Sequence, residues 1–262
     1  MFKQRFWTAL SLIPLVCFGI LYAPSWVLQS IVLAITVACF WEWSSLVPLT
    51  QQVARGAYVL IGLLCTLGLG WVFAPFCWFS LGLWGLLSWA IARYPQSSRY
   101  WAYNAVVLFL GILLLSVFAQ SLIKLLSFGI EGRYWLLFLL CFVWACDTAA
   151  YIFGKCWGRR KLIPQVSPGK TVEGLFGAAV VAGLVFAAGI FLLTLPWIMM
   201  SYCLGLVLVA LVGDLLISML KRRVGLKDTG ACLPGHGGIL DRLDSLIATA
   251  PFFYALLLWL VI

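Results

Sequence analysis

Long apolar runs constrain the fold of this chain more than any other feature of its sequence. Several of them approach or exceed about 18 residues, the length at which an apolar run indicates a membrane-spanning helix. Only 10% of the residues are charged and 65% are hydrophobic, whereas a soluble domain carries roughly a quarter charged residues. The sequence shows no series of short alternating strands of the kind that builds a transmembrane β-barrel. We therefore expect an all-α fold, a polytopic helical bundle integral to the membrane.

We predict about nine membrane-spanning helices, one in each apolar run. The first run follows Lys3 and Arg5, as in a signal peptide, but no convincing small-x-small cleavage site follows it, so we expect it to be retained. The predicted spans are residues 6–22, 26–47, 57–74, 76–92, 102–122, 134–153, 174–194, 200–219 and 246–262.

The distribution of basic residues predicts the orientation of these spans, because cytoplasmic loops are enriched in Lys and Arg. With the N-terminus in the cytoplasm, fifteen of the 17 basic residues fall in cytoplasmic segments, and only Lys124 and Arg133 fall in outer ones. The two longest polar loops, 154–173 and 220–245, then share the cytoplasmic face. This bias and anionic lipid explain the net charge of +9, so we expect membrane lipid and no nucleic acid as a partner.

Polar residues crowd into one stretch, from Asp214 to Ser245, which holds four of the eight acidic residues. Asp214 lies near the cytoplasmic end of an apolar span, where an ionised carboxylate is costly unless it has a partner or reaches water. Ser218 follows one helical turn later, and Lys221 and Arg222 follow two turns later, so these side chains share roughly one face. An ion pair at the end of a helix, without a chemical role, is the alternative.

Asp241 and Asp244 are three residues apart and face the same way if the last helix begins there. A carboxylate pair at this spacing is often only a solvated face. Together with Asp214, however, it makes an oxygen-ligand set for a hard divalent cation, because Mg²⁺ takes one or two carboxylates with water and phosphate oxygens. We therefore predict Asp214, Asp241 and Asp244 as metal ligands and Mg²⁺ as the cofactor.

Glycines, basic residues and the only histidine lie between these aspartates. Gly237 and Gly238 allow backbone geometries in which N–H groups approach a phosphate closely, and basic side chains attract a polyphosphate. A histidine in such a loop favours a ligand contact or acid/base chemistry over a purely structural role. The predicted catalytic residues are Lys221, Arg222, Lys227, Asp228, His236 and Arg242.

The loop 154–173 carries the other candidates. Ser167 and Lys170 lie in SPGKT, just before an apolar span, where hydroxyl and N–H groups at a helix N-terminus favour an anion. The segment is no P-loop, because GKT follows no GxxxxG and no βα unit exists. Glu42, near the end of the second span, is equally compatible with an exposed carboxylate and a site residue. The predicted substrate-binding residues are Asp147, Ser167, Lys170, Ser218, Gly237 and Gly238.

A divalent metal, a polyphosphate and a membrane face together indicate metal-assisted phosphoryl or nucleotidyl transfer to a lipid. An ion-coupled membrane transporter is an alternative from another class, because carboxylates within spans, such as Asp147 and Asp214, often mark ion pathways. The polar groups gather at one face rather than at the midplane of the membrane, which favours the enzyme.

The stretch from Ser218 to Asp244 resembles the signature of the phosphatidate cytidylyltransferases, or CDP-diacylglycerol synthases. It runs SMLKR, four further residues, KD, then G, LP, HGG and DRLD, without departure from that pattern. The segments SPGKTVEG and DTAAYIFG resemble the same family. The resemblance is specific over about residues 141–250 and only general over the first half of the chain.

This resemblance implies that CTP and phosphatidic acid give CDP-diacylglycerol and pyrophosphate in phospholipid biosynthesis, with Mg²⁺ required. It also implies a metal centre on Asp214 and Asp241, K⁺ as a candidate second ion, and a homodimer. Residues 1–125 would be N-terminal spans and 126–262 the catalytic region, within one integrated domain in the plasma (inner) membrane, with the active site on the cytoplasmic face. A CTP-dependent polyprenol or phytol kinase is the nearer alternative, and it would release CDP instead of pyrophosphate.

Overall fold

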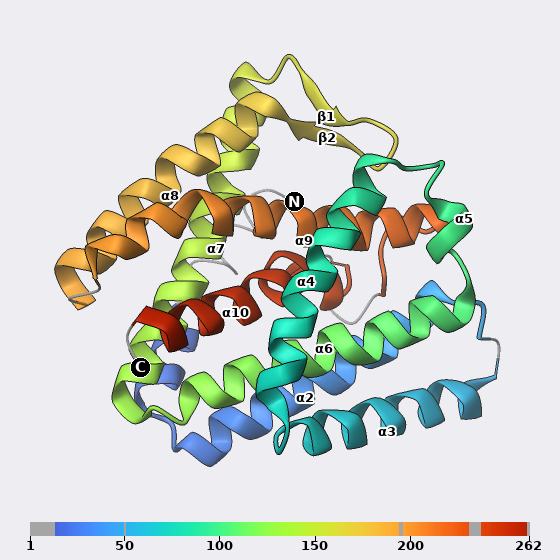
Figure 1. Cartoon of the computed structure of the whole chain (residues 1–262), viewed down its shortest axis with the longest axis horizontal. Coiled ribbons are helices and arrows are strands. Elements are labelled where there is room, and N and C mark those ends of the chain that lie inside the picture. Colours follow the sequence, from blue (N-terminus) through green and yellow to red (C-terminus); the bar gives the residue numbers. More distant parts are fainter. Residues whose placement is uncertain (1–13, 50, 194–195, 231–236, 261–262) are drawn as a thin grey trace.

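The computed structural model of the chain describes residues 14–49, 51–193, 196–230 and 237–260 (Figure 1). Residues 14–22 are helical, and almost everything after them is helix as well. The elements are α2 (Ser25–Trp43), the 3-10 helix η1 (Ser44–Leu46), α3 (Gln52–Leu69), α4 (Phe73–Ala92), α5 (Ser98–Trp101), α6 (Asn104–Leu126), α7 (Gly129–Trp157), β1 (Lys161–Ile163), β2 (Ser167–Thr171), α8 (Val172–Leu193), the 3-10 helix η2 (Trp197–Tyr202), α9 (Cys203–Arg223) and α10 (Leu240–Leu260).

Eight helices within the described part of the chain are long and apolar enough to cross a membrane. They correspond to the second through ninth predicted spans, and the all-α polytopic fold is confirmed. The first predicted span, 6–22, lies largely outside the described residues. Lipid offers no hydrogen bonds to the backbone, so an apolar span must satisfy its own N–H and C=O groups, and the helix is the local solution.

The predicted boundaries were wrong where charged residues meet the spans. α10 begins at Leu240 rather than at 246, and α9 extends to Arg223 rather than ending at 219. Lys221 near the end of α9 pairs with Asp241 at the start of α10, and Arg222 and Arg223 donate to backbone carbonyl oxygens, so helix can continue through these charged residues. The polar connection therefore shrinks from 220–245 to 224–239.

A short antiparallel hairpin, β1–β2, interrupts the helices in the segment predicted as a loop. Lys161 pairs with Thr171 and Ile163 with Ser167, with an irregularity in between. Val166, in the turn, is fully buried and anchors the hairpin against the bundle. Figure 1 shows the hairpin standing beyond the ends of α7 and α8, where it leads directly into α8.

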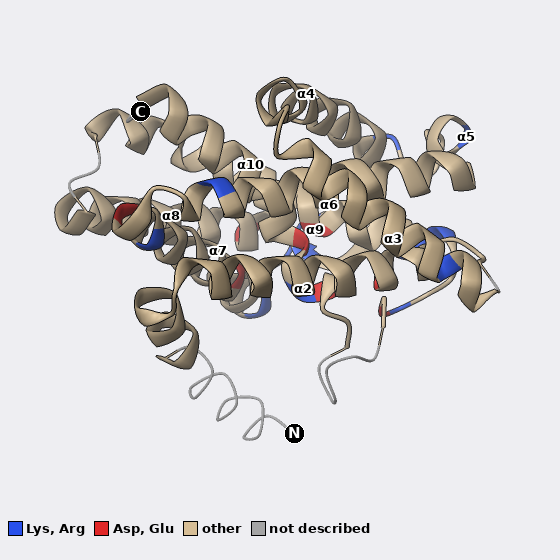
Figure 2. Cartoon of the chain, turned by 90° about the horizontal axis from the view of Figure 1, so that it is seen from below, with Lys and Arg blue, Asp and Glu red and all other residues tan. Residues whose placement is uncertain are grey.

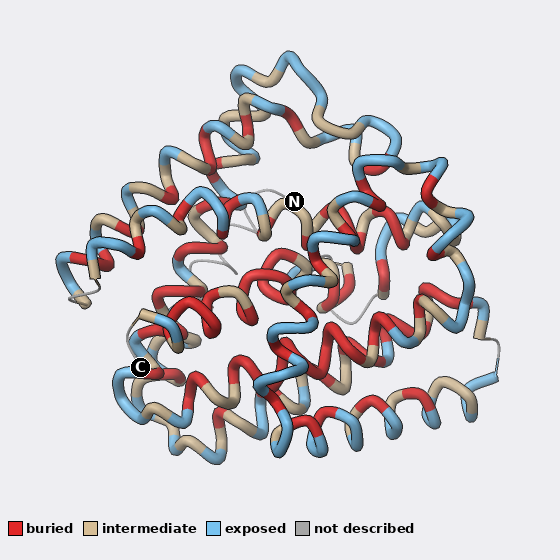
Figure 3. The backbone as a smooth tube through the Cα atoms, in the orientation of Figure 1, coloured by how far each residue is buried: buried red, intermediate tan, exposed pale blue. Residues whose placement is uncertain are grey.

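Burial separates helices that the sequence treats alike. In α6, 72% of the residues in the most apolar stretch are buried, against 33% in the equally apolar α8. Figure 3 shows this contrast, with buried positions along α6 and α10 and exposed ones along α3 and α8. α6 and α10 form the centre of the bundle, and the others turn one face outward.

Glycine brings α9 and α10 unusually close together. A Cβ atom on Gly213 would lie 2.4 Å from the carbonyl oxygen of Asp244 and 2.8 Å from Cβ of Ala248. Small residues allow this approach between membrane helices, where close van der Waals packing drives association. The contact places Asp214, the residue after Gly213, beside Asp244.

The connections between several helices gather at one end of the bundle. Arg223, at the end of α9, donates from Nε to the carbonyl oxygen of Ala102 (2.9 Å) and from Nη1 to that of Leu46 (3.0 Å), and from Nη2 to Asn104 Oδ1. It thus joins the connections after α2 and before α6 to α9, and Figure 1 shows these segments on the same side. The distribution of basic residues in the sequence had predicted that these same loops share one side of the membrane.

Candidate active site

Three carboxylates and one ammonium group converge from four elements of the C-terminal half. Asp147 lies on α7, Asp214 on α9, Asp244 on α10 and Lys170 on β2. Lys170 Nζ forms an ion pair with Asp214 Oδ2, and it also interacts electrostatically with Asp147 and Asp244. Figure 2 shows how sparse charge is elsewhere on these helices and how acidic and basic positions meet inside the bundle. We call these four residues the carboxylate cluster.

Serine donors orient the carboxylates of this cluster. Ser245 donates from its backbone nitrogen to Asp244 Oδ1 (2.7 Å) and from its hydroxyl to Asp147 Oδ1 (3.4 Å). Ser218, one turn after Asp214, donates to Asp214 Oδ1 (3.4 Å), as its helical spacing predicted. These bonds leave other carboxylate oxygens available to a further positive charge.

Lys170 supplies the positive charge of the cluster. Burial lowers the pKa of this amine, but the surrounding carboxylates, Asp214 foremost, outweigh that effect and raise the pKa above its ordinary value. Lys170 therefore stays protonated at neutral pH. One ammonium group can balance the charge of only one carboxylate, so the cluster offers further oxygen ligands to a cation.

Asp241 stands apart from this cluster, although it lies only three residues before Asp244 on α10. Its Oδ1 accepts from Lys221 Nζ (2.6 Å). Its Oδ2 accepts from the nitrogen (2.8 Å) and hydroxyl (3.0 Å) of Thr229 and from the nitrogen of Gly238 (3.3 Å). Both oxygens of Asp241 thus bind protein donors, whereas the sequence had grouped this carboxylate with Asp214 and Asp244.

Glu42 lies beside Asp241, and its side chain is almost wholly inside the protein, with 2% of the residue exposed. It accepts from the nitrogens of Ile239 (3.0 Å) and Leu240 (2.8 Å) and from the Thr229 hydroxyl (3.1 Å). The sequence left its role open between an exposed carboxylate and a site residue, and exposure is now ruled out. The sequence did contain one indication of this burial, because Glu42 is an acidic residue near the end of an apolar span.

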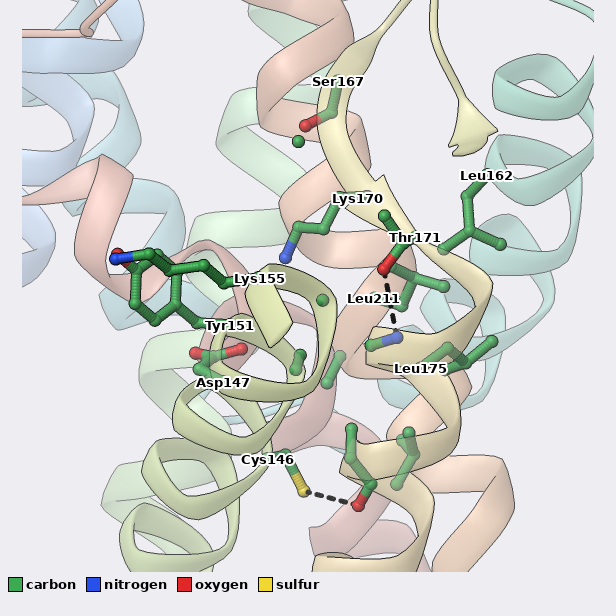
Figure 4. Close-up of a pocket in the computed structure, with 17 residues that line it drawn as sticks. Cys146, Asp147, Tyr151, Lys155, Leu162, Ser167, Lys170, Thr171, Leu175 and Leu211 are labelled. Carbon is green, nitrogen blue, oxygen red and sulfur yellow. Dashed lines mark hydrogen bonds between the residues drawn. The ribbon is translucent and has the colours of Figure 1, made fainter. Parts of the chain in front are cut away.

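A pocket of about 320 Å³ opens beside the carboxylate cluster, between α7, α8, α9 and the hairpin. Figure 4 shows Lys170 pointing into it, with Asp147 on the facing helix and Ser167 further along β2. One part of the lining is polar. The rest is apolar and made of small or branched side chains, namely Cys146, Ala150, Leu162, Leu175, Ala178, Val207, Ala210 and Leu211.

Thr171 fixes the base of the hairpin at this pocket. Its hydroxyl accepts from the nitrogen of Gly174 (3.1 Å), which caps the N-terminus of α8. Glu173 accepts from the backbone nitrogens of Arg159 (3.0 Å) and Arg160 (3.2 Å) and so closes the segment between α7 and β1. The first turn of α8 thus binds Thr171, the residue after Lys170, and the segment that precedes β1.

The other predicted site residues differ in their surroundings. Arg222 donates from Nε to the Val166 carbonyl oxygen (3.2 Å), which ties the hairpin turn to α9. Lys227, Asp228 and Arg242 are exposed. Gly237 has a positive φ of 84°, and Gly238 is buried where a Cβ would meet Thr229 and Glu42. His236 lies outside the described residues.

The residues of the cluster fit a divalent cation by charge and donor type. Within the described ranges, no three His, Cys, Asp or Glu side chains form a ready-made cage for an ion. Mg²⁺ does not require one, because it is usually bound by one or two carboxylates, with water and phosphate oxygens completing the shell. Asp244 and Asp214, brought together by the Gly213 contact, would offer such a pair if a cation displaced Lys170 from Asp214 Oδ2.

The sequence profile of the cytidylyltransferase family matches residues 3–260. The chain belongs to this family. It is 35% identical over 264 residues to a phosphatidate cytidylyltransferase of Pseudomonas aeruginosa, covering 98% of this chain and 97% of that protein. It is 33% identical over 285 residues to the phosphatidate cytidylyltransferase of Haemophilus influenzae, covering 97% of each chain. A Staphylococcus aureus phosphatidate cytidylyltransferase is 42% identical over 131 residues, about half of each chain.

Family membership agrees with the resemblance drawn from the motif residues, and it extends over the first half of the chain, where the resemblance was only general. A nucleotidyltransferase must hold a polyphosphate. In the described part of the chain, Lys170 and Lys221 are basic side chains paired with carboxylates of the candidate active site. The transporter alternative has no support in the family.

Proposed function

We propose that this protein transfers the cytidylyl group of CTP to phosphatidic acid, giving CDP-diacylglycerol and pyrophosphate. The observation that carries the proposal is the similarity, along nearly the whole chain, to relatives named phosphatidate cytidylyltransferase. The geometry supports it, because a charged cluster and a partly apolar pocket meet at the ends of membrane-spanning helices. An amphiphilic substrate and a polyphosphate can meet there.

The reaction needs no protein nucleophile. A phosphate oxygen of phosphatidic acid attacks the α-phosphorus of CTP, the new P–O bond forms, and the bond to the β-phosphate oxygen breaks as pyrophosphate leaves. Both reactants are anionic, so the protein must align them and offset their charge. Lys170 and Lys221 are the nearest described ammonium groups to the carboxylates and would bind phosphate oxygens.

We propose Asp214 and Asp244 as the first ligands of Mg²⁺, with Asp241 joining them when Lys221 turns to a phosphate. A divalent cation held by these residues would supply positive charge that offsets the charge of the substrate phosphates. Asp147, with its oxygen held by Ser245, would orient the Lys170 amine. K⁺ as a second ion stays a prediction, as do the roles of Lys227, Asp228, His236 and Arg242.

Phosphatidic acid would enter with its acyl chains among the exposed apolar faces of the helices and its phosphate toward Lys170. The pocket supports this arrangement, because its polar lining ends in small apolar side chains such as Ala178 and Ala210. Ser167, on the rim, would hold one phosphate group. The positive-inside distribution favours the cytoplasmic face for this site, and the homodimer implied by the resemblance stays a prediction.

The decisive experiment identifies the products of the purified protein in detergent micelles containing phosphatidic acid. With CTP labelled at the α-phosphate, we expect label in CDP-diacylglycerol and one pyrophosphate released per lipid formed. With label at the γ-phosphate, we expect it in pyrophosphate alone. Release of CDP with γ-label in the lipid would instead establish a lipid kinase and contradict the proposal.

Metal dependence is tested in the same assay. EDTA should abolish turnover and added Mg²⁺ should restore it, and Asp214→Asn should raise the Mg²⁺ concentration needed for half of the maximal rate. Glu131→Gln is the matched control, because Glu131 is an exposed carboxylate in the first turn of α7, distant in sequence from the cluster. Full activity in EDTA would exclude the metal assignment.

A further inference from the structure

We propose that Glu42 is a positioning residue for the active site. It reaches from α2, in the N-terminal half, to cap the N-terminus of α10, and it thereby fixes the start of the helix that carries Asp241 and Asp244. The part of this inference that concerns turnover rests on the proposed function, whereas the structural part does not.

The N-terminus of α10 needs such a partner. The first N–H groups of a helix have no acceptor within the helix and leave a partial positive charge at that end. Glu42 supplies the acceptors from another helix, with Oε1 bound by the nitrogen of Ile239 (3.0 Å) and Oε2 by that of Leu240 (2.8 Å). A buried carboxylate is costly unless it is hydrogen-bonded, and both oxygens here are.

Two glycines are shaped around this carboxylate. A Cβ atom on Gly230 would lie 2.6 Å from Glu42 Oε1, and one on Gly238 would lie 2.5 Å from Oε2. Any larger residue at either position would push the carboxylate away from α10. The motif glycine Gly238 thus has a packing role against Glu42 in addition to its backbone contact with Asp241.

Thr229 transmits the position of Glu42 to Asp241. Its hydroxyl lies 3.1 Å from Glu42 Oε2 and 3.0 Å from Asp241 Oδ2, so one hydrogen is shared between two carboxylates. Its nitrogen donates to Asp241 Oδ2 (2.8 Å), and its carbonyl oxygen accepts from the Ser45 hydroxyl (2.8 Å). The end of α2 and η1 therefore hold Thr229 from one side, and Thr229 holds Asp241 from the other.

The consequence is that the N-terminal half takes part in the site without touching the substrates. Asp241 lies in the first turn of α10 and Asp244 follows at the start of the second, at the end of the helix that frays unless it is capped. If Glu42 is lost, this turn loosens and the two aspartates lose their fixed distance from Asp214. The affinity for the metal should then fall more than the amount of folded protein.

The first test measures local order without substrate or metal. Hydrogen exchange of the purified protein should be about tenfold faster or more at the amides of Ile239 and Leu240 in Glu42→Gln than in the unaltered protein. Gln keeps the size of the side chain but can accept at one oxygen only. Glu131→Gln should leave these amides unchanged. Unchanged exchange in Glu42→Gln would overturn the proposal.

The second test separates positioning from a general loss of stability. Glu42→Gln should raise the Mg²⁺ concentration for half-maximal turnover severalfold, while a purely structural role would lower the yield of active protein without moving that concentration. If hydrogen exchange became faster while turnover and its Mg²⁺ requirement stayed unchanged, Glu42 would be a cap of α10 without a positioning role, and the proposal would be overturned. If the protein lacks the proposed activity altogether, the exchange result still decides the capping role.

Thr229 provides a second route should Glu42→Gln fail to accumulate. Thr229→Val removes the shared hydroxyl and keeps the backbone contact to Asp241, so it should shift the Mg²⁺ requirement in the same direction. Thr229→Ser, which restores a hydroxyl, should recover most of that shift. A Thr229→Val protein with an unshifted Mg²⁺ requirement would contradict the transmission from Glu42 to Asp241.

Discussion

Lys221 Nζ lies 2.6 Å from Asp241 Oδ1, and this contact joins the last turn of α9 to the first turn of α10. The side chains of both residues are largely inside the protein, with 13% and 9% of their surface exposed. The pair closes the polar connection 224–239 at both of its ends. It also holds an ammonium group and a carboxylate in place where phosphate and metal would compete for them.

Breaking this ion pair should destabilise the protein. Lys221→Met would leave Asp241 without its cation, and the free energy of unfolding should fall by about 1–3 kcal/mol, the cost of a largely buried carboxylate with a missing partner. Thermal unfolding in detergent measures this change. Lys161→Met is the control, because Lys161 is exposed on β1 and should shift the midpoint little. An equal shift of the unfolding midpoint in both variants would show that the ion pair between Lys221 and Asp241 does not stabilise the protein.

Removing the charge of Asp241 should nearly abolish activity while the protein remains folded. Asp241→Asn keeps the shape and some hydrogen bonds but removes one negative charge, and we expect turnover to fall on the order of 100-fold or more. Activity per folded molecule is the measurement. Turnover close to that of the unaltered protein would remove Asp241 from the site.

The predicted orientation gives a companion variant on the other side of the membrane. Lys124, at the end of α6, is predicted to lie on the outer face, so Lys124→Ala should change turnover by less than about twofold. A loss as large as that in Asp241→Asn would contradict the predicted orientation of the spans.

The close approach of α9 and α10 should not tolerate a methyl group. Gly213→Ala would place Cβ within 2.4 Å of the Asp244 carbonyl oxygen, so the helices must separate, and we expect a loss of about 1–3 kcal/mol in stability together with a loss of activity. Gly205→Ala, on the same helix, meets nothing within 4 Å. It should keep both stability and turnover, and a loss in this variant equal to that in Gly213→Ala would refute the packing argument.

Lys170 should make stability sensitive to alkaline pH. Because its pKa is raised in the folded protein, its contribution to stability is fully present below the ordinary lysine pKa of about 10.4 and is lost as pH rises through the higher folded value. The unaltered protein should therefore lose thermal stability above that pH by more than Lys170→Met does. If thermal stability fell with pH by the same amount in both proteins, the ion pair of the Lys170 ammonium group would be contradicted.

The sequence was sufficient for the membrane class and for the existence of the eight spans in the described part of the chain, but not for their boundaries. Charged residues are so rare in this chain that their spacing alone drew attention to Asp214, Asp241 and Asp244. The sequence could not show which side chains each aspartate binds, because those contacts depend on which faces of the helices meet. Asp241 binds Lys221 and Thr229, while Asp244, three residues later, joins Asp147 and Asp214.

Apolar spans determine that a helix crosses the membrane but not which of its faces meets protein, since lipid and protein interior are both apolar. α6 and α8 have nearly equal mean hydropathy, 2.6 and 2.5, but 72% of the most apolar stretch is buried in α6 and 33% in α8. The position of Glu42 shows the same limit. Its place in an apolar span was visible in the sequence, but only the packing of α2 against the start of α10 decided that this carboxylate caps a helix. Local composition determines the spans, and contacts between distant segments determine the site.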